Sequence, residues 1–320
     1  MREKEFFSDF GKNKEDVTFV KKEIDKIKEK GYLKGSNNLN IYYETYNVKN
    51  KKGSIVISHG FSEYIEKYNE IIYYFTQMGY SVYIIEHRGH GRSGKLGKYH
   101  DIQISVEKFE YYVEDFKTFL DLIVKKESSN LYLYAHSMGG AIGIRFLQQY
   151  DNYFKKAILT APMIEINTGK YHRLFSYLIS QVYVKFGMGE KFLFGQGPFS
   201  EKYDLNSSGT SNKYRYENSF NYLLNNKELQ RGGASFRWLN ESLKATNKIL
   251  KKQNIDNIKI PILFFQAGRD EFVKESGQNK FYEQLKQCNK IRFDNGKHEL
   301  YMENDNILKP YLKHIKEFLK

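Results

Sequence analysis

Short apolar runs alternate with longer helical patterns along most of the chain. Runs typical of buried strands lie at Ser54–Ser58, Tyr80–Ile85, Leu131–Ala135, Lys156–Thr160, Ile262–Ala267 and Lys290–Phe293. Between them, apolar residues recur at spacings of three and four, as in Phe109–Ile123, which predicts amphipathic helices. Strands that alternate with helices indicate a mostly parallel sheet with helices on its faces. We therefore predict an α/β protein, with Leu39–Tyr46 as an antiparallel edge strand.

The alternation stops between residues 162 and 257 and resumes at Ile258. This stretch contains the loop Asn206–Asn212, which is rich in Ser, Gly and Asn. We interpret 162–257 as a helical cap insertion that covers the carboxyl edge of the sheet. Residues 1–161 and 258–320 would then form a single core.

One helix of the predicted insertion has an apolar face with cations at its flanks. The apolar residues are Leu174, Phe175, Leu178, Ile179, Val182, Tyr183 and Phe186, and the cations are Lys170, Arg173, Lys185 and Lys191. Such a face either packs onto the core or lies on an anionic membrane. We favour packing, because most amphipathic helices pack against their own protein.

The pentapeptide at residues 135–139, Ala-His-Ser-Met-Gly, carries the clearest chemical signal. It follows the predicted strand residues Leu131–Tyr134 and opens a helical pattern. A serine on a sharp strand-to-helix turn with small residues two positions before and after it is typical of a nucleophile elbow. Gly139 meets that demand, and Ala135 replaces the usual glycine with the smallest side chain. A tight turn without chemistry is the alternative, so Ser137 needs partners.

Those partners follow in the expected chain order of serine, acid and histidine. Asp270 and His298 each come just after a predicted strand, where a side chain reaches the carboxyl edge of a parallel sheet. We predict that His298 is the base and that Asp270 orients it, while Glu271 takes the second role if the turn shifts by one residue. The backbone N–H groups of Phe61 and Met138 are the predicted oxyanion donors.

Three motifs together resemble the monoacylglycerol lipase and lysophospholipase family of α/β-hydrolases, in its bacterial lysophospholipase-like branch. They are His-Gly-Phe-Ser-Glu at 59–63, Arg-Gly-His-Gly-Arg-Ser at 88–93 and His-Ser-Met-Gly-Gly at 136–140. The segment 232–238 is similar to a cap segment of that branch. The resemblance implies the α/β-hydrolase fold and a serine esterase without cofactor. On these motifs we expect Glu63, His136 and Trp238 to contact substrate.

The expected substrate is a single-chain lipid ester, a lysophospholipid or a monoacylglycerol, because the resemblance and the aromatic-rich insertion both fit a fatty acyl chain. The alternatives are a short-chain carboxylesterase, a peptidase or an acyltransferase on the same fold. A non-catalytic binding protein is a further alternative, although all three triad residue types are present.

Three further patterns could indicate a nucleotide site, a metal site or a disulfide. Gly89–Gly94 satisfies the dinucleotide pattern G-x-G-x-x-G, but no helical pattern follows it at once, so we interpret it as a structural loop. The histidines lack metal-ligand spacing, so we predict no metal site. The single cysteine, Cys288, excludes an internal disulfide and falls on an apparent helical stripe with Phe281 and Leu285, which indicates a buried side chain.

The formal net charge is +13. We interpret it as a compositional bias toward lysine rather than as a nucleic-acid interface, because lysines are scattered among glutamates. Met1–Asp16 lacks an apolar signal-peptide core, and no stretch reaches the length of a membrane span. We therefore expect a cytoplasmic protein, with peripheral contact at the inner face of the membrane as an additional possibility.

Overall fold

The structure is a computed structural model that describes residues 14–98 and 100–320, so most of the segment Met1–Asp16 lies outside the described residues. Its centre is an eight-stranded sheet with the order β1-β2-β4-β3-β5-β6-β7-β8. The strands are β1 Lys28–Lys34, β2 Asn40–Tyr46, β3 Gly53–Ser58, β4 Tyr80–Ile85, β5 Leu131–His136, β6 Lys156–Thr160, β7 Ile262–Ala267 and β8 Cys288–Phe293. The six strands from β4 to β8 along this order are parallel to one another. Strand β2 is antiparallel to both of its neighbours, β1 and β4.

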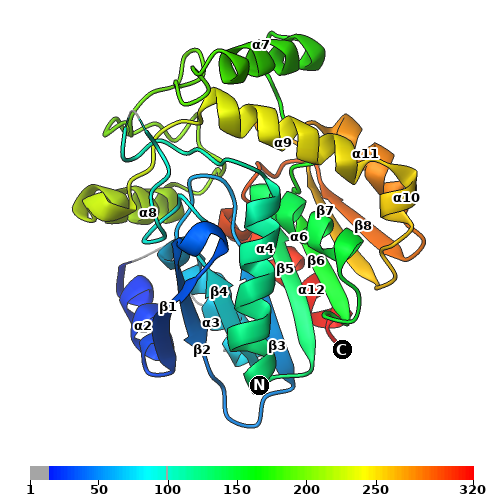
Figure 1. Cartoon of the computed structure of the whole chain (residues 1–320). Helices are drawn as coiled ribbons and strands as arrows, with labels where there is room; N and C mark the ends of the chain where they lie inside the picture. The colour runs from blue at the N-terminus through cyan, green and yellow to red at the C-terminus, as the bar shows by residue number, and fades with distance from the viewer. Residues whose placement is uncertain (1–13, 99) are drawn as a thin grey trace.

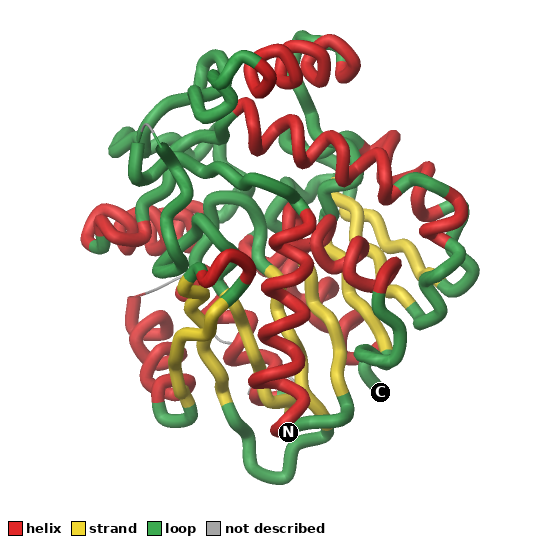
Figure 2. The backbone as a smooth tube through the Cα atoms, viewed as in Figure 1, coloured by secondary structure: helices red, strands yellow, loops and turns green. Residues whose placement is uncertain are grey.

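Helices cover both faces of this sheet (Figures 1 and 2). The longer ones are α2 Lys14–Asp25, α3 Asn69–Gln77, α4 Glu110–Phe119, α6 Ser137–Gln149, α7 Arg173–Lys185, α8 Lys213–Asn225, α9 Phe236–Ile249, α11 Glu275–Tyr282 and α12 Asp305–Phe318. The shorter turns are η1 Ser36–Asn38, η2 Ile65–Tyr68, η3 Leu120–Val124, α5 Lys125–Glu127, η4 Lys227–Leu229, α10 Lys252–Ile255 and η5 Leu300–Met302.

The pleat of the central strands explains the two layers. In β3, Val56 packs with α4 and α6, whereas Ile55 and Ile57 pack with α3 and α12 on the opposite face. Side chains alternate between the two faces in the same way along the central strands β3, β4, β5, β6 and β7, which are buried on both faces and are therefore largely apolar. The predicted mostly parallel sheet with flanking helices is therefore confirmed.

Two local predictions were wrong. The segment Leu39–Tyr46 is not the edge, because β1 pairs outside β2. The β1 sequence is rich in lysine and has no apolar alternation, as befits a mostly exposed edge strand. Cys288 does not continue a helix, because α11 ends at Tyr282 and Cys288 begins β8. It is partly buried there, and this burial raises the pKa of its thiol to about 12.

The segment 162–257 lies between β6 and β7 and carries α7 to α10. It is seen above the carboxyl ends of the strands in Figure 1. Arg215 of α8 fixes part of it to the core, because its guanidinium forms a buried ion pair with Glu70 of α3 at 2.7 Å. The division into a core and a cap insertion remains our interpretation.

Helix α7 packs beside α9 but leaves most of its apolar face uncovered. Leu174, Phe175, Leu178 and Val182 are each at least half exposed, and Phe186 is 69% exposed. The favoured interpretation, a face packed onto the core, is therefore wrong for this outer surface. Among residues 14–98 and 100–320, no helix combines the length and apolarity needed to cross a membrane.

Candidate active site

The predicted catalytic side chains meet at the carboxyl edge of the sheet. β3 lies at the centre of the sheet, with β4 on one side and β5 on the other, so the strand order reverses there. Ligands of open α/β sheets bind in the crevice at such a switch point. The loop after β3 brings Phe61 to this edge, and β5 brings Ser137. Asp270 and His298 follow β7 and β8.

Ser137 sits on a strained turn. β5 ends at His136 and α6 begins at Ser137, whose φ of 52° lies in the left-handed region that side chains other than glycine seldom adopt. The turn also presses against the end of β3. A Cβ atom at Gly139 would lie 2.1 Å from the carbonyl oxygen of Ser58, so only glycine fits there.

The unusual Ala135 also has a physical explanation. Gly143 lies on α6 opposite β5, and a Cβ atom built on it would approach the methyl group of Ala135 to 3.2 Å. The glycine that this turn commonly has before the serine is replaced here by alanine, and Gly143 leaves the space that the added methyl occupies. The departure at Ala135 therefore leaves the turn intact.

Ser137, His298 and Asp270 form one hydrogen-bonded chain. The Nε2 atom of His298 lies 2.8 Å from the hydroxyl of Ser137, and its Nδ1 atom lies 2.6 Å from Oδ2 of Asp270. The other carboxylate oxygen of Asp270 accepts the N–H groups of Phe272 and Val273 at 2.9 and 3.0 Å. These bonds fix the Asp270 carboxylate, so Asp270 rather than Glu271 contacts the imidazole.

The Asp270 carboxylate polarises the imidazole of His298. Burial disfavours the charged form of His298, but the adjacent Asp270 carboxylate outweighs it and raises the pKa of His298 above its usual 6.5. Burial likewise opposes ionisation of Asp270, but His298 and the two backbone N–H groups lower its pKa. Asp270 is therefore held as a carboxylate that stabilises a protonated His298.

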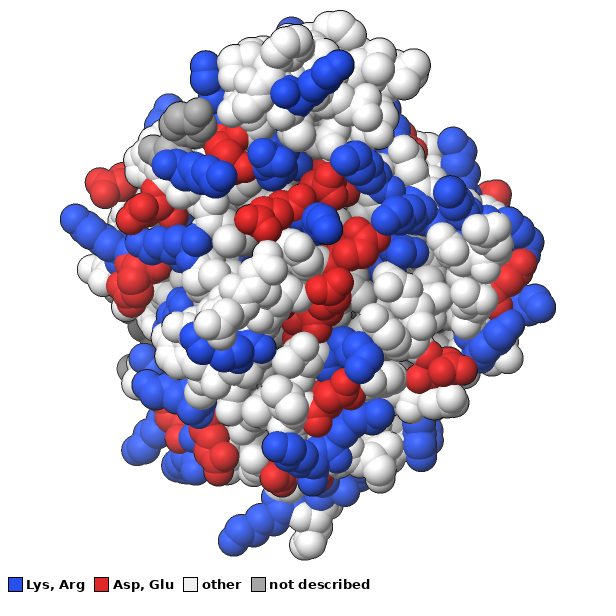
Figure 3. All heavy atoms as spheres, viewed as in Figure 1, with Lys and Arg blue, Asp and Glu red and all other residues white. Residues whose placement is uncertain are grey.

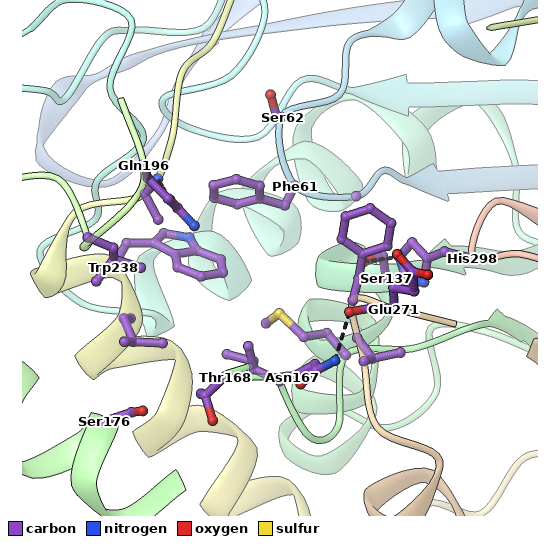
Figure 4. Close-up of a pocket in the computed structure, with 18 of the residues that line it drawn as sticks. Phe61, Ser62, Ser137, Asn167, Thr168, Ser176, Gln196, Trp238, Glu271 and His298 are labelled. Atoms are coloured by element: carbon purple, nitrogen blue, oxygen red, sulfur yellow. Dashed lines mark hydrogen bonds between the residues drawn. The ribbon is translucent and has the colours of Figure 1, made fainter. Parts of the chain in front are cut away.

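The predicted oxyanion donors, Phe61 and Met138, belong to the loop after β3 and to the start of α6. Met138 is the second residue of α6, where a helical N–H has no intrahelical acceptor and points beyond the helix end. Phe61 follows β3, and its ring packs against Trp238 of α9 with centroids 4.5 Å apart. Figure 4 shows Phe61 and Trp238 side by side across the cavity from Ser137 and His298.

A cavity of about 690 Å³ opens above Ser137, within the range of small-molecule sites. Its floor comes from the loops after the strands, and its upper walls come from the segment 162–257. The apolar residues of those walls include Tyr171, Phe175, Ile179, Leu193, Phe194 and Phe236. Sequence reasoning did not single out these wall residues as a site, although three of them fall on or beside the predicted apolar helix.

The three expected substrate contacts, Glu63, His136 and Trp238, all line the cavity. Their surroundings differ. Both Trp238 and Glu63 are buried, but the Trp238 ring faces the cavity, whereas the Glu63 carboxylate already accepts hydrogen bonds from protein donors. Burial opposes ionisation of Glu63, but the Lys67 ammonium lowers its pKa below the usual range. Burial also lowers the pKa of His136 to about 3, so this imidazole is neutral.

The histidines of the two glycine-rich loops form a separate buried group. The rings of His87 and His90 lie 4.6 and 5.4 Å from that of His59, and burial lowers the pKa of His59 to about 4. Within the described residues, no three His, Cys, Asp or Glu side chains are arranged to hold a metal ion. Residues 88–93 form turns rather than a helix, unlike a dinucleotide-binding loop.

The sheet, the strained serine turn and the Ser137–His298–Asp270 chain define the class of α/β-hydrolases with a serine nucleophile. The sequence profile of the hydrolase family described as serine aminopeptidase, S33, matches residues 49–305. The chain therefore belongs to this family.

Individual relatives support the resemblance to lysophospholipases. The probable lysophospholipase L2 of Haemophilus influenzae is 29% identical over 293 residues, 90% of this chain and 91% of the relative. Lysophospholipase L2 of Escherichia coli K12 is 28% identical over 257 residues, 78% of this chain and 73% of the relative. Among solved structures, monoglyceride lipase of Saccharomyces cerevisiae superposes with a TM-score of 0.70 at 20% identity, covering 92% and 95% of the two chains, which supports the fold.

The strained turn generates a prediction about stability. Both Ser137→Ala and Ser137→Gly remove the hydroxyl, but only glycine accepts a φ of 52° without steric strain. We expect the glycine variant to be more stable than the alanine variant by about 1 kcal/mol in urea unfolding. An alanine variant of equal or greater stability would contradict the strained turn.

Proposed function

We propose that this chain is a serine esterase that hydrolyses the carboxylic ester of a single-chain lipid, a lysophospholipid or a monoacylglycerol, through an acyl-enzyme on Ser137. The observation that carries the proposal is the hydrogen-bonded chain Ser137–His298–Asp270 at the base of a largely apolar cavity. The names of the relatives from Haemophilus influenzae and Escherichia coli support the lipid class.

In the first half of the proposed reaction, the Ser137 hydroxyl attacks the ester carbonyl carbon while Nε2 of His298 takes its proton. The carbonyl oxygen becomes an oxyanion, and the N–H groups of Phe61 and Met138 stabilise it. The bond to the alcohol oxygen then breaks. His298 gives its proton to that oxygen, the alcohol leaves, and Ser137 carries the acyl group as an ester.

In the second half, His298 takes a proton from a water molecule that attacks the acyl carbon. The second tetrahedral intermediate collapses, its bond to the Ser137 oxygen breaks, and His298 returns the proton to Ser137. The fatty acid leaves, and the hydrogen bonds between Ser137, His298 and Asp270 form again. Asp270 keeps the proton of neutral His298 on Nδ1, so that Nε2 faces Ser137 as the acceptor.

The segment 162–257 would act as the cap. Its aromatic and aliphatic side chains, including Phe175, Ile179 and Phe236, line the cavity, so an acyl chain would be removed from water there. Each buried methylene contributes about 0.8 kcal/mol to binding in such surroundings. The cavity therefore favours long acyl chains over acetyl esters.

The first test of this function is a chain-length series of monoacylglycerols presented as monomers. We expect kcat/KM to rise by at least tenfold from butanoyl to decanoyl, because the added methylenes enter the apolar cavity. Ser137→Ala should abolish hydrolysis. Activity confined to acetyl and butanoyl esters would favour the short-chain esterase, and activity confined to peptides would favour the peptidase that the family description names.

A second prediction concerns pH. Because His298 must be neutral to accept the serine proton, kcat/KM should rise with pH through the raised pKa of this histidine. Asp270→Asn removes the negative charge, so the midpoint of this acidic limb should move to lower pH while kcat falls by about 10² to 10⁴. Glu271→Gln, one residue away, should leave the midpoint in place. A shift in the second variant and none in the first would contradict the assignment of Asp270.

We further propose that the exposed face of α7 contacts an anionic membrane surface. This face is continuous with the cavity, because Phe175 is half exposed and also lines the cavity wall. Figure 3 shows mostly uncharged surface over α7 at the top of the view, with lysine and arginine side chains near it. Lys170 and Lys191 lie at the flanks in sequence and would attract acidic lipids, at about 1 kcal/mol each.

The membrane proposal is tested by sedimentation with phosphatidylglycerol vesicles. Leu178 is half exposed on the apolar face, so Leu178→Glu should weaken vesicle binding by about tenfold. Gln181→Glu adds the same charge at an exposed polar position of the same helix and should bind much better than the leucine variant. Equal binding by the two variants would contradict a role for the apolar face.

A further inference from the structure

A buried carboxylate lies between the loops that carry the catalytic groups. Glu63 is 4% exposed and comes two residues after the proposed oxyanion donor Phe61. Its Oε2 atom accepts hydrogen bonds from the N–H of Gly60 and the hydroxyl of Tyr68, both at 2.5 Å. Its Oε1 atom accepts from the Tyr301 hydroxyl at 2.7 Å and from the Lys67 ammonium at 3.1 Å.

Three of these donors, Gly60, Lys67 and Tyr68, lie within five residues of Glu63, whereas Tyr301 is 238 residues away along the chain. Gly60 directly precedes Phe61 in the oxyanion loop, and Tyr301 belongs to η5, directly after the His298 loop. Lys67 adds a second connection, because its ammonium also contacts Glu299 at 2.6 Å, next to His298. The Glu63 carboxylate therefore joins the loop that supplies an oxyanion donor to the loop that supplies the base.

The approach of Glu63 to the oxyanion loop depends on glycine. A Cβ atom at Gly60 would lie 2.8 Å from Oε2 of Glu63 and 3.0 Å from the His136 ring. The backbone of Gly60 is therefore confined between Glu63 and the residue that precedes the nucleophile. A displacement of Glu63 would move the oxyanion loop relative to Ser137.

The contacts of Glu63 are not those of a substrate ligand. Each carboxylate oxygen already accepts two protein donors, and Lys67 compensates its charge. A substrate hydroxyl would have to displace one of these buried donors, which would leave that donor unsatisfied at a cost of about 1–3 kcal/mol.

We propose that Glu63 is a positioning residue, which holds the N–H of Phe61 and the imidazole of His298 in register for the ester reaction. The inference rests on the proposed esterase function. It replaces the expectation that Glu63 binds substrate. The group contacts neither the ester nor Ser137, and it acts through the two loops that it joins.

The variant Glu63→Gln tests the role of the charge at almost constant volume. The side-chain amide has one oxygen and one NH₂ group, and the backbone N–H of Gly60 and the ammonium of Lys67 can only donate hydrogen bonds. Whichever way the amide turns, its NH₂ group faces one of these donors. We expect kcat for decanoyl monoacylglycerol to fall by about 10- to 100-fold, below the 10²–10³ loss for a missing oxyanion donor. KM should stay within about twofold of the wild-type value, because the acyl cavity is intact.

Glu44 provides a matched control. It is 2% exposed and accepts the hydroxyl groups of Tyr42 and Tyr46, but it lies on β2 among residues outside the cavity lining. Glu44→Gln therefore removes a buried carboxylate that also bonds tyrosine hydroxyls. We expect its kcat to remain within about twofold of wild type, even where its melting temperature falls as much as that of Glu63→Gln.

Three outcomes would overturn the inference while wild-type hydrolysis proceeds. The first is that Glu63→Gln has the kcat and KM of wild type, and the second is that Glu63→Gln raises KM without lowering kcat. The third is that Glu44→Gln loses as much kcat as Glu63→Gln. If Glu63→Gln does not fold, Tyr301→Phe decides, because it removes one donor and keeps the ring. Its kcat should fall at least threefold at unchanged KM, and wild-type kcat would overturn the inference. A wild-type protein that hydrolyses none of the esters would instead contradict the proposed function.

Discussion

The close contact between the nucleophile turn and the end of β3 is the constraint on which the site depends. Gly139 fits against Ser58 only because it has no side chain, and this contact brings the start of α6 to the loop that contains Phe61. The left-handed conformation of Ser137 follows from the same turn. Local strain of about 1–3 kcal/mol is tolerated because the buried sheet on both sides fixes the backbone. This turn holds the Ser137 hydroxyl 2.8 Å from Nε2 of His298.

Charge in the site is arranged around this turn. The Asp270 carboxylate stabilises a protonated His298, whereas burial keeps His136 neutral directly beside the nucleophile. Glu63 and Lys67 compensate each other behind the oxyanion loop. Most of the cavity wall above is apolar, so little water would surround a bound ester. In such a water-poor site, fixed dipoles stabilise charge more strongly than they do in solution.

The sequence predicted the parts of this structure that depend on local pattern. The buried parallel strand Ile262–Ala267 is apolar except for Gln266, and its bounds agree with the prediction. The strand Lys28–Lys34 was missed because it lies at an edge and its lysines give no alternation. The choice between Asp270 and Glu271 depends on a one-residue register in a turn, which no periodicity encodes. The bond between Glu63 and Tyr301 could not be predicted from the sequence, because it joins residues 238 positions apart through the tertiary fold.

The central claim is that Ser137 is a nucleophile activated by His298. The most direct test is mass spectrometry of the whole folded protein after reaction with a long-chain alkyl fluorophosphonate. The account predicts one adduct, located on the peptide that contains Ser137 and absent from Ser137→Ala, with labelling strongly slowed in His298→Ala. Folded protein that forms no adduct, or an adduct that persists in Ser137→Ala, would contradict it.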